Sequence, residues 1–238
     1  MKPVDQLKVR IFADGADKKG MLEMYRLPHV KGFTTNPSLM RKVGIADYEA
    51  FAKDIVSAIP DRSISFEVFA DDFGEMERQA RRIAPWGKHV SVKIPIMNTK
   101  RESAIPLVRK LSRDGIALNV TAMFTLEQVQ AVVDAVKGGA PCFVSVFAGR
   151  IADTGRDPVP LMAEAVKRLK AAPNTELIWA SPRELLNIYQ ADDIGCHVIT
   201  VTNDILKKLS LVGKDMNEYS LETVKTFYED GRAASYKL

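Results

Sequence analysis

The sequence predicts an α/β fold: a single (β/α)₈ TIM barrel with an extra C-terminal helix. Eight short runs of apolar and β-branched residues recur along the 238-residue chain. Most segments between them place apolar residues three and four positions apart, which is the spacing of an amphipathic helix. Eight such alternations favour a closed barrel over an open doubly wound sheet, and chains of this length commonly form such a barrel as one domain.

The predicted strands are short and largely apolar. In chain order they are KVRIFA (8–13), KGFTT (31–35), ISFEVF (64–69), HVSVKI (89–94), IALNVT (116–121), CFVSVF (142–147), ELIWA (176–180) and HVITVT (197–202). Runs of this kind are expected in a parallel barrel, where helices cover one face of each strand and packed side chains fill the interior.

Two motifs mark the starts of helices. In TTNPS, Asn36 fits the N-cap position and Pro37 the first helical residue. In ASPRE, Ser181 and Glu184 fit a capping box that opens the helix after the seventh strand. We therefore expect helices to begin directly after the second and seventh strands.

Apolar periodicity and glycines mark the bodies and ends of other helices. The segments 125–137 and 159–170 carry apolar residues on one face. Gly115 and Gly195 stand where helices are expected to end, because glycine readily adopts the left-handed conformation that closes many helices. These helices alternate with the strands and support the barrel.

One further amphipathic helix exceeds the count of eight, over about residues 220–230. Its apolar side carries Leu221, Val224, Phe227 and Tyr228. We expect a single domain over 1–238, with 212–238 as its C-terminal helical extension. The extension would pack on the barrel or on a neighbouring subunit.

The charges are mixed along the chain. There are 34 basic and 30 acidic residues, which give a net charge of +4. No basic block is interleaved with aromatic residues, so we expect no nucleic-acid partner. A mild positive excess suits an anionic small substrate.

The cysteines and the apolar runs indicate a cytoplasmic protein. Cys142 and Cys196 each lie in an apolar run, and we expect two reduced, buried thiols. The N-terminus lacks the apolar core of a signal peptide, and no apolar run is long enough to span a bilayer, so we expect no membrane partner.

Polar residues at the carboxyl ends of the strands are the candidates for a site, because barrels of this kind build their active sites there. They are Asp14, Thr34, Thr35, Asn36, Glu67, Lys93, Asn119, Thr121, Ser145, Arg150, Ser181 and Arg183. No set of His, Cys and carboxylate residues has metal-ligand spacing, so we expect no metal. The turn ADGADKKG after the first strand does not fit the dinucleotide-binding motif GxGxxG.

Structural roles compete with functional ones for several of these residues. Asp14 can open a turn, and Asn36 and Ser181 can act only as N-caps. Thr121 and Ser145 can be hydroxyls bonded to backbone groups. Each of these interpretations stays open from the sequence alone.

Ion pairs offer a second structural alternative. Arg150 can pair with Asp153 or Asp157 on the surface. Lys93 and Glu67 can form a buried structural pair, although such pairs are weak stabilisers.

The chemistry that fits a lone lysine in an apolar strand is Schiff-base formation. Desolvation disfavours the ammonium form and leaves a nucleophilic amine. The amine of Lys93 would attack a ketone, and the iminium would serve as an electron sink for breaking or making the adjacent C–C bond. Asp14 and Glu67 can divide the proton transfers.

The remaining candidates suit a phosphorylated sugar. Asparagine and threonine side chains can hold sugar hydroxyls and a catalytic water. Arg150 and Arg183 can bind phosphate as planar forks. Ser181 and Arg183 would lie at the start of a helix, where free backbone N–H groups favour an anion.

The segments GFTTNPSLM, SFEVFAD, VKIPIM, NVTAMFTLEQ, VSVFAGRIADTGRD and WASPRELLNI carry a family resemblance. In order and spacing, from Asp14 to about Leu211, the sequence resembles the transaldolase family of class I aldolase barrels. The resemblance implies that Lys93 forms the Schiff base and that Asp14 abstracts and returns the hydroxyl proton. It also implies that Glu67, with a water held by Thr121, carries protons during imine formation and hydrolysis.

The resemblance also implies which residues bind substrate. Asn36 and Asn119 would bind the dihydroxyacetone portion, and Ser145 would bind hydroxyls of the donor. Thr35 and Phe147 would also belong to the substrate-binding residues. Arg150, Ser181 and Arg183 would hold the sugar phosphate. No cofactor is implied.

The chain is similar in length to the compact branch of this family, which includes fructose-6-phosphate aldolases. Those aldolases typically have Gln where Glu67 stands and Tyr where Phe147 stands, so both residues resemble the transferase type. The expected activity is transaldolase of the pentose phosphate pathway, acting on sedoheptulose 7-phosphate or fructose 6-phosphate. The alternatives are a fructose-6-phosphate aldolase-type lyase, a transaldolase for a modified sugar, and a barrel that binds sugar phosphate without turnover.

Compact members of the family are often rings of five or ten subunits. The resemblance therefore implies a homo-oligomer, possibly a pentamer or decamer, in which the C-terminal helix helps to shape a neighbouring subunit's site.

Overall fold

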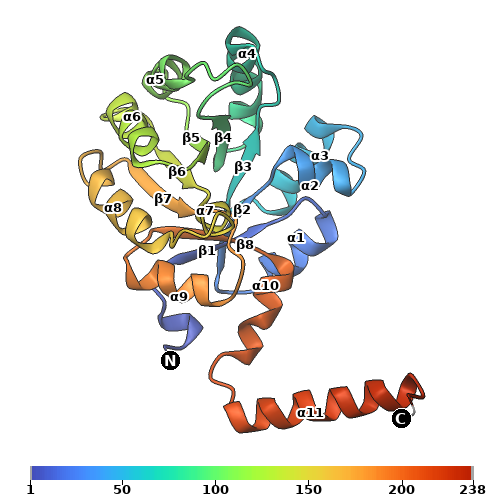
Figure 1. The fold of residues 1–238 in the computed structure, drawn as a ribbon. Coiled ribbons are helices and arrows are strands. Elements are labelled where there is room, and N and C mark those ends of the chain that lie inside the picture. The colour runs from blue at the N-terminus through green and yellow to red at the C-terminus, as the bar shows by residue number, and fades with distance from the viewer. Residues whose placement is uncertain (1, 237–238) are drawn as a thin grey trace.

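The computed structural model describes residues 2–236, and they form a closed barrel of eight parallel strands. Each strand pairs with the next along the chain, and β1 closes the barrel by pairing with β8 (Figure 1). The strands are β1 (Arg10–Asp14), β2 (Val30–Thr34), β3 (Ser63–Glu67), β4 (Val90–Pro95), β5 (Leu118–Met123), β6 (Cys142–Val146), β7 (Thr175–Trp179) and β8 (Val198–Thr202). The predicted fold class is confirmed.

Most α-helices lie around the outside of the barrel, whereas the short α7 is drawn near its centre and α11 stands away from it (Figure 1). They are α1 (Lys18–Tyr25), α2 (Pro37–Lys42), α3 (Tyr48–Ala58), α4 (Phe73–Ile83), α5 (Ile105–Arg113), α6 (Leu126–Val136), α7 (Ala148–Ala152), α8 (Val159–Leu169), α9 (Leu186–Asp193), α10 (Asn203–Lys207) and α11 (Met216–Ala233). Short 3₁₀ helices span Val4–Gln6, Ala84–Trp86 and Lys208–Leu211.

Aromatic and aliphatic side chains fill the barrel interior below the polar ends of the strands. Phe12 and Phe143 meet edge to face with their ring centroids 5.7 Å apart, and they pack with Ile178 and Val198. Gly32 makes room for this layer, because a Cβ there would lie 2.6 Å from Cζ of Phe12. Side chains alternate along a strand. The residues two positions after Phe12, Phe143, Ile178 and Val198 therefore also point inward, one layer closer to the carboxyl ends of the strands.

Most of the predicted helix signals are confirmed. Asn36 is the N-cap of α2, and its side chain accepts a hydrogen bond from the N–H of Leu39 at 2.9 Å. Gly115 and Gly195 follow α5 and α9 with φ of 84° and 73°. Both glycines therefore occupy the left-handed position expected after a helix.

The capping box predicted at Ser181 is wrong. Helix α9 begins at Leu186, and Ser181 has a φ of 60°. The side-chain oxygen of Asn187 instead accepts hydrogen bonds from the N–H groups of Arg183 (2.8 Å) and Glu184 (3.1 Å). Because these donors are satisfied by a side chain of α9 itself, the chain from Ser181 to Leu185 stays outside the helix.

Helix α11 stands away from the barrel (Figure 1). None of its residues is buried, and Phe227 is 70% exposed. The predicted amphipathic helix therefore exists and is longer than expected, but it does not pack on the barrel of its own chain.

Both cysteines are free and buried, as predicted. Burial raises the pKa of the Cys142 thiol to about 12, and the same cause raises the pKa of Cys196 to about 12. Both thiols are therefore inert structural groups rather than nucleophiles.

Candidate active site

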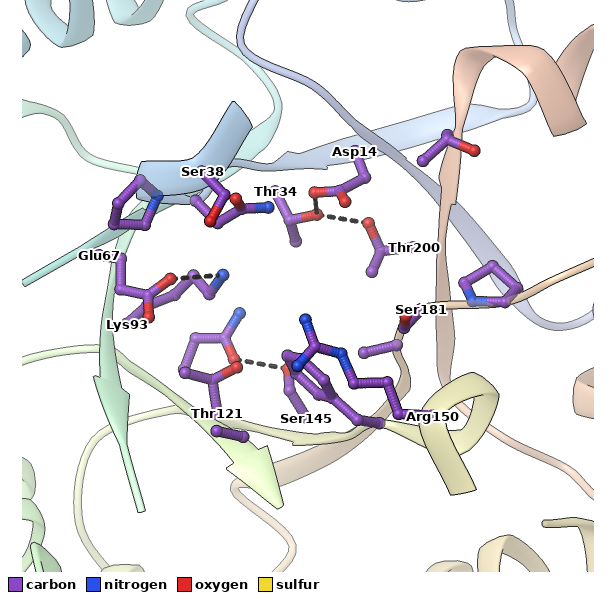
Figure 2. A pocket seen from close by; sticks show the side chains of 18 of the residues that line it. Asp14, Thr34, Ser38, Glu67, Lys93, Thr121, Ser145, Arg150, Ser181 and Thr200 are labelled. Carbon is purple, nitrogen blue, oxygen red and sulfur yellow. Dashed lines mark hydrogen bonds and ion pairs between the residues drawn. The ribbon is translucent and has the colours of Figure 1, made fainter. Parts of the chain in front are cut away.

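A polar cavity of about 450 Å³ opens at the carboxyl ends of the strands. It is lined by Asp14, Thr34, Asn36, Pro37, Ser38, Glu67, Lys93, Asn119, Thr121, Ala122, Ser145, Phe147, Arg150, Ala180, Ser181, Pro182, Arg183, Thr200 and Thr202. Every predicted site residue except Thr35 lines it. Figure 2 shows Lys93 and Glu67 at one side of this pocket and Arg150 and Ser181 across from them.

Lys93 is held in the pocket by two partners. Its Nζ lies 3.0 Å from Oε2 of Glu67 and donates a hydrogen bond to the carbonyl of Thr35 at 2.8 Å. The parallel register places Lys93 beside Glu67 on β3 and beside Asn119 on β5. The lysine side chain is only 8% exposed. The ion pair foreseen as the structural alternative is thus present.

Asp14 is the last residue of β1 and lines the same pocket at the carboxyl ends of the strands. Burial raises the pKa of its carboxyl group, although the positive charge of Lys93 and a hydrogen bond from Thr34 oppose the rise. The Thr34 hydroxyl donates to Oδ1 of Asp14 at 2.8 Å and also contacts the hydroxyl of Thr200. An aspartate oriented in this way, with a raised pKa, suits a group that takes and returns a proton.

A buried amide–hydroxyl chain crosses the floor of the pocket. Nδ2 of Asn119 donates to Oγ of Ser65 at 3.0 Å, and Oδ1 of Asn119 accepts from Oγ of Ser145 at 2.6 Å. These bonds fix the orientation of the Asn119 amide. Beside it, the hydroxyl oxygen of Thr121 is buried with no hydrogen-bond partner among residues 2–236, which leaves it available to a water or a substrate hydroxyl.

Neighbouring residues of the TTN motif play different parts. Asn36 uses its side-chain oxygen as the N-cap of α2, which confirms the cap interpretation, and it also lines the pocket. Thr35 is fully buried, and its hydroxyl donates to the carbonyl of Ser65 at 2.8 Å. Only the carbonyl of Thr35 reaches the site, where it accepts from Lys93.

Two arginines line the pocket: Arg183, and Arg150, which lies across from Lys93 (Figure 2). The guanidinium of Arg150 lies over the ring of Phe147, 5.1 Å from its centroid, and has no ion-pair partner among the described residues. Arg183, rather than Arg150, pairs with Asp153. The hydrogen bonds from Arg183 lower the pKa of the Asp153 carboxyl. The arrangement can receive an anion between the two arginines.

The sequence interpretation missed several residues of the pocket. Ser38, Thr200 and Thr202 line it, and of the two neighbouring candidates Thr34 and Thr35 only Thr34 does. The signal for β8 was present, because HVITVT alternates threonine with apolar residues. Applying the alternation of strand side chains to β2 would have selected Thr34 over Thr35, since Thr34 and Gly32 share a face.

The backbone of Glu67 is held by a residue that the sequence did not single out. The Tyr48 hydroxyl donates to the carbonyl of Glu67 at 2.7 Å and accepts from its N–H at 2.8 Å. The Tyr48 ring meets Phe69 edge to face at 5.5 Å. Burial raises the pKa of Tyr48 and keeps the hydroxyl protonated. Tyr48 thus fixes the end of β3 where Glu67 points into the pocket.

Replacing Tyr48 by phenylalanine is expected to lower the free energy of unfolding by about 1–3 kcal/mol, because the ring stays while two Glu67 backbone groups lose their partner. Chemical denaturation measures this. Tyr25→Phe is the matched control, since the Tyr25 hydroxyl bonds Asp61 on the exposed surface. Equal effects of the two substitutions would contradict the role of Tyr48.

Residues 2–236 contain neither a metal-binding cluster nor a membrane-spanning helix. Within residues 2–236, no cluster of three or more His, Cys, Asp or Glu side chains is placed to hold a metal ion. Over the same residues, no helix combines the length and the apolar character that crossing a bilayer requires.

Together, the closed parallel barrel and the polar pocket at the carboxyl ends of its strands define a TIM-barrel protein with its site at the usual face. Residues 11–237 match the family model described as transaldolase/fructose-6-phosphate aldolase. The chain belongs to this family, whose members are aldolase-type enzymes.

Similar curated proteins support the same family. A probable transaldolase of Dehalococcoides mccartyi is 36% identical over 202 residues, which cover 84% of this chain and 90% of that protein. One of Thermoanaerobacter sp. is 33% identical over 231 residues, which cover 97% of this chain and all of that protein. One of Streptococcus equi subsp. equi is 34% identical over 232 residues, with coverage of 96% and 100%.

Solved structures show the fold alone. The structure titled KGPDC from Streptococcus mutans superposes with a TM-score of 0.58 at 13% identity, covering 85% of this chain and 91% of that one. Dihydrodipicolinate synthase from Rhodopseudomonas palustris has the same TM-score at 14% identity, covering 97% and 81%.

Proposed function

We propose that the protein is a transaldolase that moves a dihydroxyacetone unit from a ketose phosphate to an aldose phosphate through a Schiff base on Lys93. The observation that carries the proposal is the position of Lys93, a buried amine 3.0 Å from the Glu67 carboxylate in a polar pocket that also contains Asp14. The proposal needs no cofactor. It places the enzyme in the cytoplasm, in sugar-phosphate metabolism of the pentose phosphate type.

Imine formation begins with Glu67 taking a proton from Lys93. The free amine attacks the ketone carbon of the donor, and loss of the carbonyl oxygen as water leaves the iminium. Thr121, with its unpartnered hydroxyl, positions that water, and Glu67 returns the protons that the addition and dehydration require. Hydrolysis of the final imine follows the same steps in reverse.

Cleavage of the C–C bond uses Asp14. Its carboxylate takes the proton of the hydroxyl next to the bond to be broken, and the bonding electrons pass into the iminium to give an enamine on Lys93. The aldehyde product leaves. When an acceptor aldehyde adds to the enamine, Asp14 returns the proton to the new alkoxide, so the protons balance over the two half-reactions.

The rest of the pocket orients the donor. Asn36, Asn119 and Ser145 are placed to bind the hydroxyls of the three-carbon unit. We assign the phosphate to Arg150, Ser181 and Arg183, which all line the pocket, and Figure 2 shows Arg150 and Ser181 across the pocket from Lys93.

A transferase is favoured over a lyase by the apolar ring of Phe147, which lines the pocket without a hydroxyl that could deliver a proton or a water to the enamine. The enamine would therefore persist until an acceptor aldehyde arrives. Release of free dihydroxyacetone from fructose 6-phosphate without an acceptor would favour the lyase instead.

The test is intact-mass measurement after borohydride reduction with fructose 6-phosphate, with and without erythrose 4-phosphate. We expect an adduct of one three-carbon unit on Lys93 that the acceptor discharges. A panel of ketoses, including modified sugars, extends the test to other donors. No adduct with any ketose would reject the Schiff-base proposal.

We also propose that the protein is a homo-oligomer, with α11 of one chain packed on a second copy. The exposed apolar stripe of α11 supports this, because it includes Val224 (60% exposed) and Phe227 (70% exposed) and lies away from its own barrel. The sequence resemblance favours rings of five or ten subunits.

Replacing Phe227 by aspartate is expected to shift the assembly to smaller species, because it puts a charge in the centre of the apolar stripe. Sedimentation velocity measures this. Thr226→Asp is the control, since residue 226 lies on the opposite face of the helix. A monomeric wild type, or an equal shift in both variants, would contradict the proposal.

A further inference from the structure

Asp153 connects the two loops that supply the arginines of the pocket. It directly follows α7, which carries Arg150, and its backbone N–H donates to the carbonyl of Gly149 at 2.9 Å. Its carboxylate accepts two hydrogen bonds from Arg183 on the loop after β7, one from Nε at 2.8 Å and one from Nη2. The carboxylate is thus anchored on one loop and holds the arginine of the other.

The same two loops also touch through their backbones. The N–H of Gly149 approaches the carbonyl of Ala180 at 3.4 Å. A Cβ added at Gly149 would lie 1.5 Å from the carbonyl oxygen of Ser181, so only glycine fits there. The Asp153–Arg183 pair therefore bridges a junction whose backbone is already closely packed.

The hydrogen bonds of Arg183 determine which edge of its guanidinium group remains free to face the pocket. Asp153 occupies the edge formed by Nε and Nη2, while Nη1 donates to the hydroxyl of Ser181 at 3.0 Å. Arg183 and Ser181 line the pocket, whereas Asp153 does not. An arginine side chain that is 46% exposed would otherwise sample many rotamers.

We infer that Asp153 is a positioning residue, which holds Arg183 so that its free edge and the Ser181 hydroxyl face the phosphate of the substrate. The inference rests on the proposed use of Arg183 as a phosphate ligand. In the alternative, the negative charge of Asp153 would repel the phosphate and compete with it for Arg183, so that Asp153 would weaken anion binding. Positioning dominates because Asp153 binds the edge away from the pocket, and repulsion between exposed charges is screened by solvent and salt.

Calorimetric binding of inorganic phosphate tests the inference without requiring turnover. Asp153→Asn is expected to bind phosphate about three- to fivefold more weakly than the wild type, the range of a partly exposed pair. Asp157→Asn is the matched control. It removes the same charge from the same loop, but Asp157 contacts the N–H of Val159 and not Arg183. The control should change phosphate binding less than twofold.

A double-mutant cycle shows whether Asp153 acts through Arg183. In the Arg183→Ala background, Asp153→Asn is expected to have no further effect on phosphate binding. Asp153→Glu should restore part of the affinity. In turnover, KM for fructose 6-phosphate should rise in Asp153→Asn with kcat nearly unchanged, while KM for unphosphorylated fructose stays the same.

Several results would overturn the inference. They are tighter or unchanged phosphate binding in Asp153→Asn, an equal loss in Asp157→Asn, an effect that persists without Arg183, and no phosphate binding by the wild type. Failure of the proposed function would give a different result, namely that no ketose forms an imine with Lys93. The phosphate-binding measurements would still show whether Asp153 positions Arg183.

Discussion

Replacing Lys93 by methionine is expected to abolish turnover, with kcat/KM at least about 10⁴-fold lower, because no other side chain can form the covalent intermediate. The borohydride adduct with fructose 6-phosphate should disappear as well. Methionine keeps most of the length and apolar contacts of lysine. Steady-state assay and intact mass measure the two effects.

The same substitution separates catalysis from structure. It leaves Glu67 without its partner, but the Glu67 side chain is 18% exposed to the pocket and can be hydrated there. We therefore expect Lys93→Met to remain folded but to melt at a lower temperature than the wild type. The double variant Lys93→Met/Glu67→Gln should regain the lost melting temperature, because it no longer buries an unpaired carboxylate. Retained turnover would contradict the nucleophile. A fold lost in the single variant and regained in the double one, with no adduct in the wild type, would assign the pair a structural role.

Replacing Asp14 by asparagine is expected to lower kcat roughly 10²- to 10⁴-fold, the range for loss of a positioned base. Lys93 and Glu67 are intact in this variant, so the imine should still form. Because cleavage is blocked, reduction with borohydride should trap the whole six-carbon donor instead of the three-carbon unit. The mass of the adduct decides between these outcomes.

Although Asp14→Asn should lower kcat, it should raise the stability of the fold. Burial raises the pKa of Asp14, so its ionised form costs folding free energy at neutral pH. Asp14→Asn removes that cost, and we expect a higher melting temperature than the wild type at pH 7. As the pH falls below the raised pKa, the native aspartate takes up a proton and the difference should shrink, and it should vanish only below the ordinary pKa that the carboxyl has in the unfolded chain. Asp17→Asn, which preserves the N-cap of α1 outside the pocket, is the control.

Much of the barrel and of its site was predictable because both depend on local pattern. Each strand is an apolar run between helical segments, and the closed barrel fixes which end of each strand carries the site. A lysine inside such a run, as in HVSVKI, is therefore conspicuous. The register between β3 and β4 then places Glu67 beside Lys93 without further assumptions.

The features that the sequence could not predict depend on contacts between distant segments. The motif at Ser181 fits a capping box, but the Asn187 side chain satisfies the donors and the helix begins at Leu186. The choice of Arg183 over Arg150 as the partner of Asp153 depends on how two loops pack. The role of Tyr48 depends on where α3 lies against the end of β3.

The pairing of β1 with β8 has a consequence for how the chain is made. Arg10 finds its partner Val198 only after nearly the whole barrel has left the ribosome. At translation rates of about 5–20 residues per second, β1 waits on the order of 10–40 s with an open edge. An unpaired strand edge recruits other chains. Nascent chains on one polysome therefore need shielding until β8 emerges, and a message truncated before β8 would yield a product prone to aggregate.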